Sequence, residues 1–385
     1  MIVRALLPSD IPAVNRLHQQ VWWPERSTRG WQWLMANPAA QEVQLPAGLV
    51  LDDGYGQAAA FLGSFTQRFW RGDEVRYASS GFSIIVPPEV KGASRDLVPT
   101  FFALPCLSAH YTFNCNALSS PIYERLGMHA WPPVTHSLKL SWITRPLTCA
   151  AARGLRELVN RQPSSVNWLG ERLLPRQSIL KRGVLAPDIK EITDLSDRGA
   201  YGQYWQALKA EGRFMADRSP AMLRWRLSDP DLTQPILLLA AYREGRIVAH
   251  AMAMMAKYSS IEPATLEILD LDGLEDDRDR IPDLVRALFA LAHPLGAAKL
   301  RLQMLSPRLL SDLGELAERA RREGGYGHSY MRTAKGFRGL ETWQPTPFDG
   351  DHSICWRPLP RHANHTPPQE AEAPLEEVQT QIRAA

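Results

Sequence analysis

The sequence has few cysteines and none of the spacings that signal a cysteine-based site. Its 385 residues contain four: Cys106, Cys115, Cys149 and Cys355. No two of them form a CxxC motif, and so few cysteines in so long a chain predict neither a disulfide framework nor a zinc module. We therefore expect no metal site, and a reducing, cytoplasmic compartment.

Long hydrophobic segments are missing as well. Apolar runs such as ILLLAA at 236–241 are far shorter than the roughly 20 residues that span a bilayer. The first residues, MIVRALLPSD, lack the apolar core of a secretory signal. The sequence therefore predicts a soluble protein without a membrane span.

The chain also lacks a marked excess of charge. It has 44 basic and 41 acidic side chains, a net charge of +3, which is too small to predict nucleic acid as an obligate partner. The charge balance is compatible with a small-molecule or amine-bearing acceptor as the partner. With 45% hydrophobic residues, a chain of this length predicts two domains, each with its own core.

What the sequence does contain is a repeated pattern. WLMANP at 33–38 and WRLSDP at 225–230 each place an Asn or Asp and then a Pro four and five residues after a Trp. Both patterns indicate a helix end. Each is followed by two apolar runs around a turn, at 48–63 and 236–254, which is a hairpin signal. We infer two copies of one α/β plan.

The repeat predicts the domain boundaries. The first copy runs over 1–145 and the second over 186–360, joined by a connector at 146–185 that begins with a helix. The tail at 361–385 is rich in Pro and Glu and is expected to be disordered. Within each copy, strands alternate with helices, which predicts a mixed, mostly antiparallel twisted sheet flanked by helices.

The stretch NALSSPIYERLGM at 116–128 predicts a short helix in the first copy. Its apolar residues at spacings of four predict a buried stripe of Leu118, Ile122 and Leu126. Tyr123 lies just beside that stripe, and Gly127 suits the left-handed residue that ends a helix. The tyrosine is either a packing residue or a positioned proton donor.

These residues carry a family resemblance. In the first copy, an Asn, a small residue, an apolar residue, a Tyr, a Gly and a further apolar residue occur as Asn116, Ser119, Ile122, Tyr123, Gly127 and Met128. At this spacing the chain resembles the GNAT superfamily of acyl-CoA-dependent N-acyltransferases, present twice. The resemblance implies that Tyr123 is a general acid, which protonates the departing thiolate of coenzyme A while an amine attacks.

A second stretch, VPPEVKGASRD at 86–96, is similar to the phosphate loop of that family. Unsatisfied N–H groups at a helix N-terminus can hold the pyrophosphate of coenzyme A. The resemblance implies acetyl-CoA or another acyl-CoA as cosubstrate, bound by Ile85, Val86, Lys91, Gly92, Ala93, Ser94, Arg95, Asp96 and Asn116. Ser94 and Asp96 depart from the family pattern, where glycine or alanine is usual.

A general base is harder to identify. The strand before the loop, at 78–86, has no carboxylate. In the second copy, strict alternation along the corresponding strand at 266–273 places Glu267, Leu269 and Leu271 on one face, and Ile268, Asp270 and Asp272 on the other. Acids on such a strand face solvent, an ion-pair partner or a site. Glu267 is the candidate catalytic residue.

The second copy has an acidic stretch at 271–284 where a phosphate loop would lie, so it is expected to be degenerate. The leading hypothesis is transfer of an acyl group, acetyl in the first instance, to an amine by the first copy. Two alternatives stay open. One is a FemAB-like aminoacyl-tRNA-dependent transferase, against which the lack of a basic helical arm counts. The other is a catalytically inactive tandem binding module.

Overall fold

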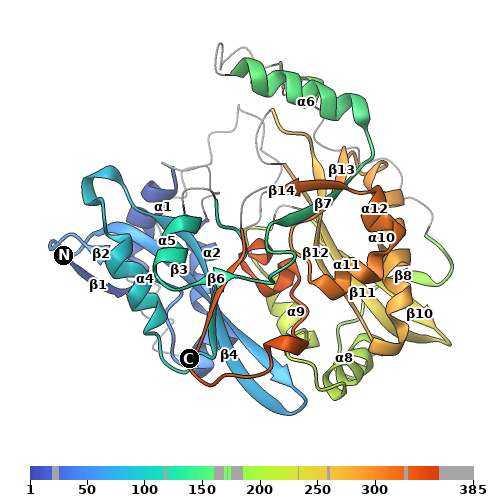
Figure 1. Cartoon of the computed structure of the whole chain (residues 1–385), viewed down its shortest axis with the longest axis horizontal. Coiled ribbons are helices and arrows are strands. Elements are labelled where there is room, and N and C mark those ends of the chain that lie inside the picture. The colour runs from blue at the N-terminus through green and yellow to red at the C-terminus, as the bar shows by residue number, and fades with distance from the viewer. Residues whose placement is uncertain are drawn as a thin grey trace.

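Two sheets stand side by side, with helices packed around them (Figure 1). The computed structural model describes residues 1–19, 26–116, 119–159, 169–170, 172–174, 185–232, 234–257, 261–324 and 328–354. Within these residues, no helix combines the length and the apolar character needed to cross a membrane. The predicted tail at 361–385 lies outside the described residues.

Sheet A contains the predicted cofactor-binding half. Its strand order is β1-β2-β3-β4-β5-β15-β6, with β9 added beside β3. All neighbours are antiparallel except β4 and β5. The strands are β1 Ile2–Ala5, β2 Gly48–Asp52, β3 Ala58–Arg71, β4 Glu74–Ile85, β5 Ala109–Thr112, β6 His129–Ala130, β9 Met215–Ala216 and β15 Tyr330–Thr333.

Sheet B has the order β14-β7-β13-β12-β11-β10-β8, and only β12 and β13 are parallel. The predicted mixed, mostly antiparallel sheets are therefore confirmed. The strands are β7 Leu138–Ile143, β8 Ile189–Glu191, β10 Leu237–Arg243, β11 Arg246–Ala256, β12 Thr265–Gly273, β13 Lys299–Leu302 and β14 Arg321–Gly324.

The α-helices follow the predicted repeat. The predicted helix ends hold, because α2 ends before Asn37 and α9 ends before Asp229. The helices are α1 Ile11–Gln19, α2 Thr28–Met35, α3 Pro38–Glu42, α4 Ser94–Phe102, α5 Ser120–Arg125, α6 Pro146–Val159, α8 Ala200–Ala210, α9 Pro220–Leu227, α10 Ile281–Ala292, α11 Pro307–Leu313 and α12 Glu315–Arg319.

The two sheets repeat one order and exchange one strand. Read from β1 and from β8, each sheet has five strands of its own half of the chain, then one strand from the other half, then a last strand of its own. The exchanged strands are β15, which lies between β5 and β6, and β7, which lies between β13 and β14. Each sheet is therefore completed by the other half of the chain (Figure 1).

The exchanged strands do not follow the domain boundaries predicted from the sequence. The strand predicted at the end of the first copy exists as β7, but it pairs with β13 and β14 of sheet B. Sheet membership therefore does not change at residue 145. The division into 1–145, 146–185 and 186–360 stays a prediction about the repeat in the sequence, while the sheets are built across it.

One local prediction, the alternation of side chains along β12, was wrong. The alternation predicted for β12 is broken by a bulge in its pairing with β11, after Ile268. Leu271 therefore lies with Ile268 in the core under sheet B, while Leu269 packs into a different cluster. A bulge adds one residue and shifts all later side chains to the other face.

Candidate functional site

The parallel strands β4 and β5 separate partway along their length. They pair only from Ala78 with Ala109 to Ser80 with Tyr111. Beyond Ser80, β4 continues to Ile85 beside β3, with a register shift and with Ser83 in the left-handed region at φ 48°. No described strand pairs with the other edge of β4 there, so its backbone groups face a gap.

A cleft of about 90 Å³ opens in this gap. One wall is the free part of β4 and the other is the end of β5 with the segment that follows it. The lining residues are Gly81, Phe82, Ser83, Ile84, Ile85, Thr112, Asn114, Cys115, Asn116, Ser119, Tyr123 and Asp351. Three residues singled out in the sequence, Ile85, Asn116 and Tyr123, are therefore brought together.

Tyr123 is the buried apolar residue of α5, which corrects the predicted stripe. It is 2% exposed and packs with Leu97 and Phe101, whereas Ile122 and Leu126 are half-buried. Leu118 lies outside the described residues. The helix is only six residues long, and Ser120 and Tyr123 are its buried residues.

The hydroxyl of Tyr123 faces β4. A Cβ placed on Gly81 would lie 3.7 Å from its oxygen, which is an ordinary contact distance, so the hydroxyl lies beside this strand. Burial raises the pKa of Tyr123 well above its ordinary value, and the carboxylate of Asp351 adds to the rise. Because the neutral phenol is favoured, Tyr123 holds its proton at neutral pH.

Asn116 positions the helix that carries Tyr123. Its side-chain Oδ1 accepts a hydrogen bond from the N–H of Ser119 at 2.9 Å, and the hydroxyl of Ser119 accepts one from the N–H of Asn116 at 3.0 Å. This reciprocal bonding satisfies N–H groups that a helix start otherwise leaves unpaired. At the other end, Gly127 has φ 90°, as its predicted role requires.

Asp351 is the functional candidate that the sequence analysis missed. It begins the 3₁₀ turn Asp351–Ser353 in the second half of the chain. The turn is fixed to the end of β5, because His352 bonds the carbonyl of Phe113 at 3.1 Å. Gly350 also touches Phe113, so closely that a Cβ there would lie 2.5 Å from the ring. A buried carboxylate from one half thus lines the cleft of the other.

The predicted phosphate loop lies apart from the cleft lining. It forms the 3₁₀ turn Pro88–Val90 followed by α4, and Val86, Lys91, Gly92, Ala93, Ser94, Arg95 and Asp96 do not line the cleft. Five of its N–H groups bond backward along the loop: those of Val90, Lys91, Ala93, Arg95 and Asp96. The N–H groups of Gly92 and Ser94 make no such bond within the described residues. Asp96 is exposed and Gly92 borders open space. The carboxylate of Asp96 therefore does not block the loop.

Glu267 lies in sheet B, outside the cleft. It is 4% exposed and forms an ion pair with Arg301, and it accepts a hydrogen bond from Gln303 at 3.2 Å. The structure therefore does not bring Glu267 to Tyr123. Ion pairing was one of the outcomes expected for acids on this strand.

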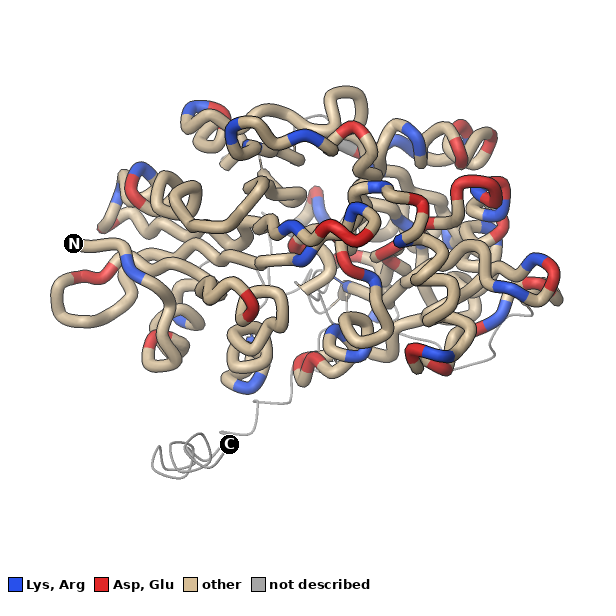
Figure 2. Tube along the Cα trace, turned by 90° about the horizontal axis from the view of Figure 1, so that it is seen from below, with Lys and Arg blue, Asp and Glu red and all other residues tan. Residues whose placement is uncertain are grey.

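The acidic residues that follow β12 form ion pairs with basic residues. They lie in the 3₁₀ segment Glu275–Arg280, whose acids pair with basic residues of neighbouring elements. Arg243 binds both Asp277 and Asp279, and Arg308 binds Glu275 at 2.7 Å. Figure 2 shows charged positions of both signs gathered in this half of the molecule, away from the N-terminus.

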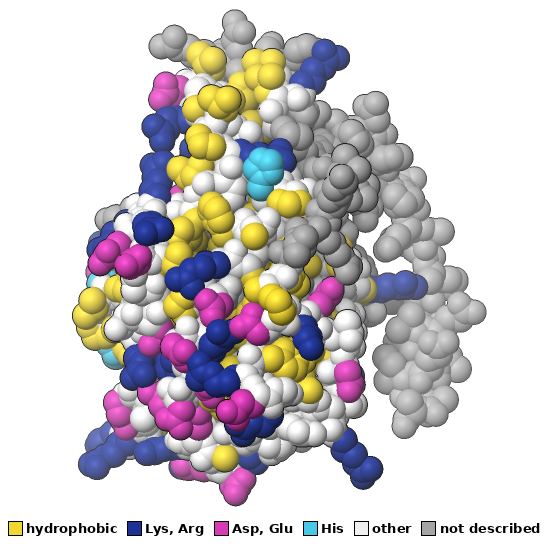
Figure 3. All heavy atoms as spheres, turned by 90° about the vertical axis from the view of Figure 1, so that its right-hand side faces the viewer, with side chains coloured by type: hydrophobic (Ala, Val, Ile, Leu, Met, Phe, Trp, Pro, Cys, Tyr) yellow, Lys and Arg dark blue, Asp and Glu magenta, His cyan; other side chains and the backbone are white. Residues whose placement is uncertain are grey.

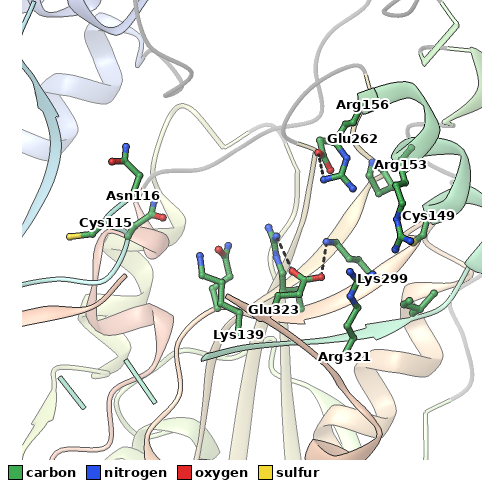
Figure 4. Close-up of a pocket in the computed structure, with 16 residues that line it drawn as sticks. Cys115, Asn116, Lys139, Cys149, Arg153, Arg156, Glu262, Lys299, Arg321 and Glu323 are labelled. Atoms are coloured by element: carbon green, nitrogen blue, oxygen red, sulfur yellow. Dashed lines mark hydrogen bonds and ion pairs between the residues drawn. The ribbon is translucent and has the colours of Figure 1, made fainter. Parts of the chain in front are cut away.

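A second, larger cavity of about 390 Å³ shares Asn114, Cys115 and Asn116 with the cleft. Figure 4 shows these residues on one side and basic side chains from α6 and sheet B on the other. The remaining lining residues are Lys139, Ile143, Cys149, Ala152, Arg153, Arg156, Glu262, Pro263, Lys299, Arg301, Gln303, Arg321 and Glu323. The two hollows therefore border the same segment, which precedes α5.

No protein-family model matches the sequence, and no curated protein matches it. Among solved structures, it is similar to an N-myristoyltransferase of Saccharomyces cerevisiae with bound myristoyl-CoA, at 8% identity and a TM-score of 0.51, covering 86% of this chain and 76% of that one. Two GCN5-related N-acetyltransferases also match. That of Kribbella flavida has 14% identity and a TM-score of 0.47, and that of Anabaena variabilis ATCC 29413 has 12% and 0.49; they cover 86% of this chain and 71% and 72% of theirs.

At these identities the likeness to the yeast structure shows the fold alone. It confirms the predicted fold class, two GNAT-like units in tandem. What the cleft does chemically has to be argued from the residues that line it.

Proposed function

We propose that the protein transfers a short acyl group, acetyl in the first instance, from coenzyme A to an amine in the cleft between β4 and β5. The observation that carries the proposal is the separation of these strands opposite the hydroxyl of Tyr123. An acyltransferase of similar fold supports it, since the yeast structure holds myristoyl-CoA.

The free edge of β4 suits the extended arm of coenzyme A. From Gly81 to Ile85 the strand pairs on one side only, and unpaired strand groups bind an extended partner through its amides. The phosphates would lie at the loop that follows, where the N–H groups of Gly92 and Ser94 and the side chain of Lys91 are at hand. The cleft volume of about 90 Å³ favours a short acyl group.

Acyl-CoA supplies a thioester carbonyl, which the amine attacks so that a C–N bond forms and the C–S bond breaks. Tyr123 donates its proton to the departing sulfur, because its raised pKa keeps the phenol protonated until a thiolate develops. Asp351, on the same cleft, receives the proton that the amine gives up. The sequence pattern instead predicted Glu267 as the base. Substituting Asp351 and Glu267 one at a time distinguishes between these two candidates.

Calorimetric titration with acetyl-CoA tests the proposal. We expect micromolar binding that weakens about tenfold in Ser94→Glu, which adds a negative charge beside the phosphates, and also weakens in Gly92→Ala. Gly92 has φ 103°, so its alanine variant is strained. Gly54→Ala is the matched control, because Gly54 has φ 96° and borders open space in the turn between β2 and β3.

The outcome against the proposal is equally definite. Absence of heat with acetyl-CoA and with myristoyl-CoA, in a protein that is folded by circular dichroism, would overturn it and favour the inactive binding module. Equal losses in Gly92→Ala and Gly54→Ala would remove the loop from the binding site.

A further inference from the structure

The larger cavity lies against one face of sheet B. Basic residues gather on this face because successive side chains of a strand point to opposite faces. In β13, Leu300 and Leu302 point into the core, so Lys299 and Arg301 point the other way. The same holds in β7, where Lys139 faces the cavity and Leu140 the core. Helix α6 lies over this face and adds Arg153 and Arg156 (Figures 1 and 4).

This concentration of positive charge is only partly neutralised. Six basic residues line the cavity, against the carboxylates of Glu262 and Glu323. Glu262 pairs with Arg156 at 3.4 Å and Glu323 with Lys299 at 3.4 Å. Arg301 pairs with Glu267, so Arg156, Lys299 and Arg301 each have a carboxylate partner among the described residues.

Two of the arginines stand out. The side chains of Arg153 and Arg321 form no hydrogen bond or ion pair with any described residue, and both line the cavity. In the sheet, Arg301 and Arg321 flank Ser141 from its two neighbouring strands, so their side chains leave the same face of the sheet. On the outer face shown in Figure 3, by contrast, basic and acidic side chains are interspersed.

We propose that this cavity binds an anionic group, a carboxylate or phosphate, carried by the amine acceptor. The cavity and the cleft share Asn114, Cys115 and Asn116 as lining residues, so the two sites are neighbours, and an acceptor held by its anion in the cavity would have its amine extended toward the thioester. The proposal rests on the proposed transferase function for the role of the amine, but the anion site itself does not depend on it.

Matched amine pairs test the site without coenzyme A. Calorimetry compares O-phosphoethanolamine with ethanolamine, and β-alanine with propylamine. We expect the anionic member of at least one pair to bind, with an affinity that falls as salt is added. Binding by only one anionic amine identifies phosphate or carboxylate as the group recognised. Equal binding within both pairs, or none by either anionic amine, overturns the proposal.

The variants use two neighbouring arginines of β14. Arg321→Glu reverses a charge that lines the cavity, whereas Arg322→Glu reverses the next residue, which is also exposed and does not line it. We expect about a tenfold loss of anionic-amine affinity in the first and little change in the second. Arg153→Glu, on α6, gives an independent second loss. Equal losses in Arg321→Glu and Arg322→Glu overturn the site.

Acetyl-CoA binding separates this proposal from the previous one. We expect Arg321→Glu to bind acetyl-CoA as the wild type does; a parallel loss would mean that the cavity holds the phosphates of coenzyme A, which overturns the acceptor role. If acetyl-CoA does not bind the wild type but the anionic amine still depends on Arg321, the transferase proposal fails and the anion site stands.

Discussion

Trp33 and Trp225, the residues that open the two copies of the repeated pattern, stack face to face with their ring centroids 4.2 Å apart and their planes at 8°. The indole N–H of Trp33 also donates to the carbonyl of Trp225 at 3.0 Å. Equivalent positions of a duplicated sequence thus meet at the contact between the copies.

The stacked pair should contribute to stability as a unit. We expect Trp225→Ala to lower the free energy of unfolding by about 3 kcal/mol, as removal of a large aromatic side chain does. Combining it with Trp33→Ala in a double-mutant cycle should give a coupling energy of about 1 kcal/mol. Urea unfolding measures both, and additive losses would show that the stacking itself contributes nothing.

Tyr123→Phe should reduce acyl transfer without changing the binding of acyl-CoA. Loss of the proton donor is expected to lower kcat roughly a hundredfold. Steady-state kinetics and calorimetry provide the two measurements. Tyr330→Phe is the control, because Tyr330 packs in the same apolar cluster but donates its hydroxyl hydrogen bond to Glu124. Equal kcat values in Tyr123→Phe and the wild type would make Tyr123 a packing residue.

Asp351 and Glu267 are the two candidates for the general base, and they lie in different parts of the molecule. Replacing each carboxylate by the corresponding amide should show which of them accepts the proton. We expect Asp351→Asn to lower kcat roughly a hundredfold and Glu267→Gln to leave it close to the wild type, since Glu267 is held by Arg301 in the other sheet. Kinetics with a saturating amine measures both. The opposite ranking would return the role of base to Glu267.

The exchanged strands predict that neither half folds alone. A fragment of residues 1–145 lacks β15, which separates β5 from β6 in sheet A. We expect this fragment and residues 146–385 to be unfolded or aggregated separately, and to form one folded complex when they are coexpressed. Size-exclusion chromatography and circular dichroism test this. A folded, monomeric 1–145 fragment would contradict the structural role of β15.

Asp349 should make stability fall as pH rises. Its buried carboxyl shares Arg218 with Asp270, and burial raises its pKa to about 6 from the ordinary 3.8. The folded state therefore binds this proton more tightly than the unfolded state, so the stabilisation present at low pH is lost as pH passes through about 6.

From pH 5 to 7 the loss amounts to about 1 kcal/mol for a shift of this size. Asp349→Asn keeps a carbonyl acceptor but cannot titrate, so its unfolding free energy should change less over that range. Urea unfolding at both pH values decides the matter, and parallel pH dependence in the two proteins would exclude Asp349 as the cause.

Local patterns carried much of the fold. The Trp-to-Pro segments, the two hairpins and the glycine at 127 were predictable because their signals lie within a few residues of one another. The bulge in β12 was not, because it depends on how that strand pairs with β11. The burial of Tyr123 was missed because the core that receives it comes from α4.

The residues of the candidate site were likewise predictable only where their signal is local in the sequence. The tyrosine and Asn116 belong to one short pattern, so sequence spacing found both. Asp351 reaches the cleft from more than 200 residues farther along the chain, and no local signal distinguishes it from a turn residue. The basic cavity was missed for a similar reason, since its side chains come from four separate elements that only the fold places around one space.

The exchanged strand β15 also imposes an order on biosynthesis. Sheet A needs Tyr330–Thr333 to join β5 to β6, and the ribosome delivers these residues only after the whole stretch from 131 to 329 has been made. Until then the nascent N-terminal half carries an open strand edge, which is prone to pair with other chains. We expect newly made protein to depend on chaperones until that late segment emerges.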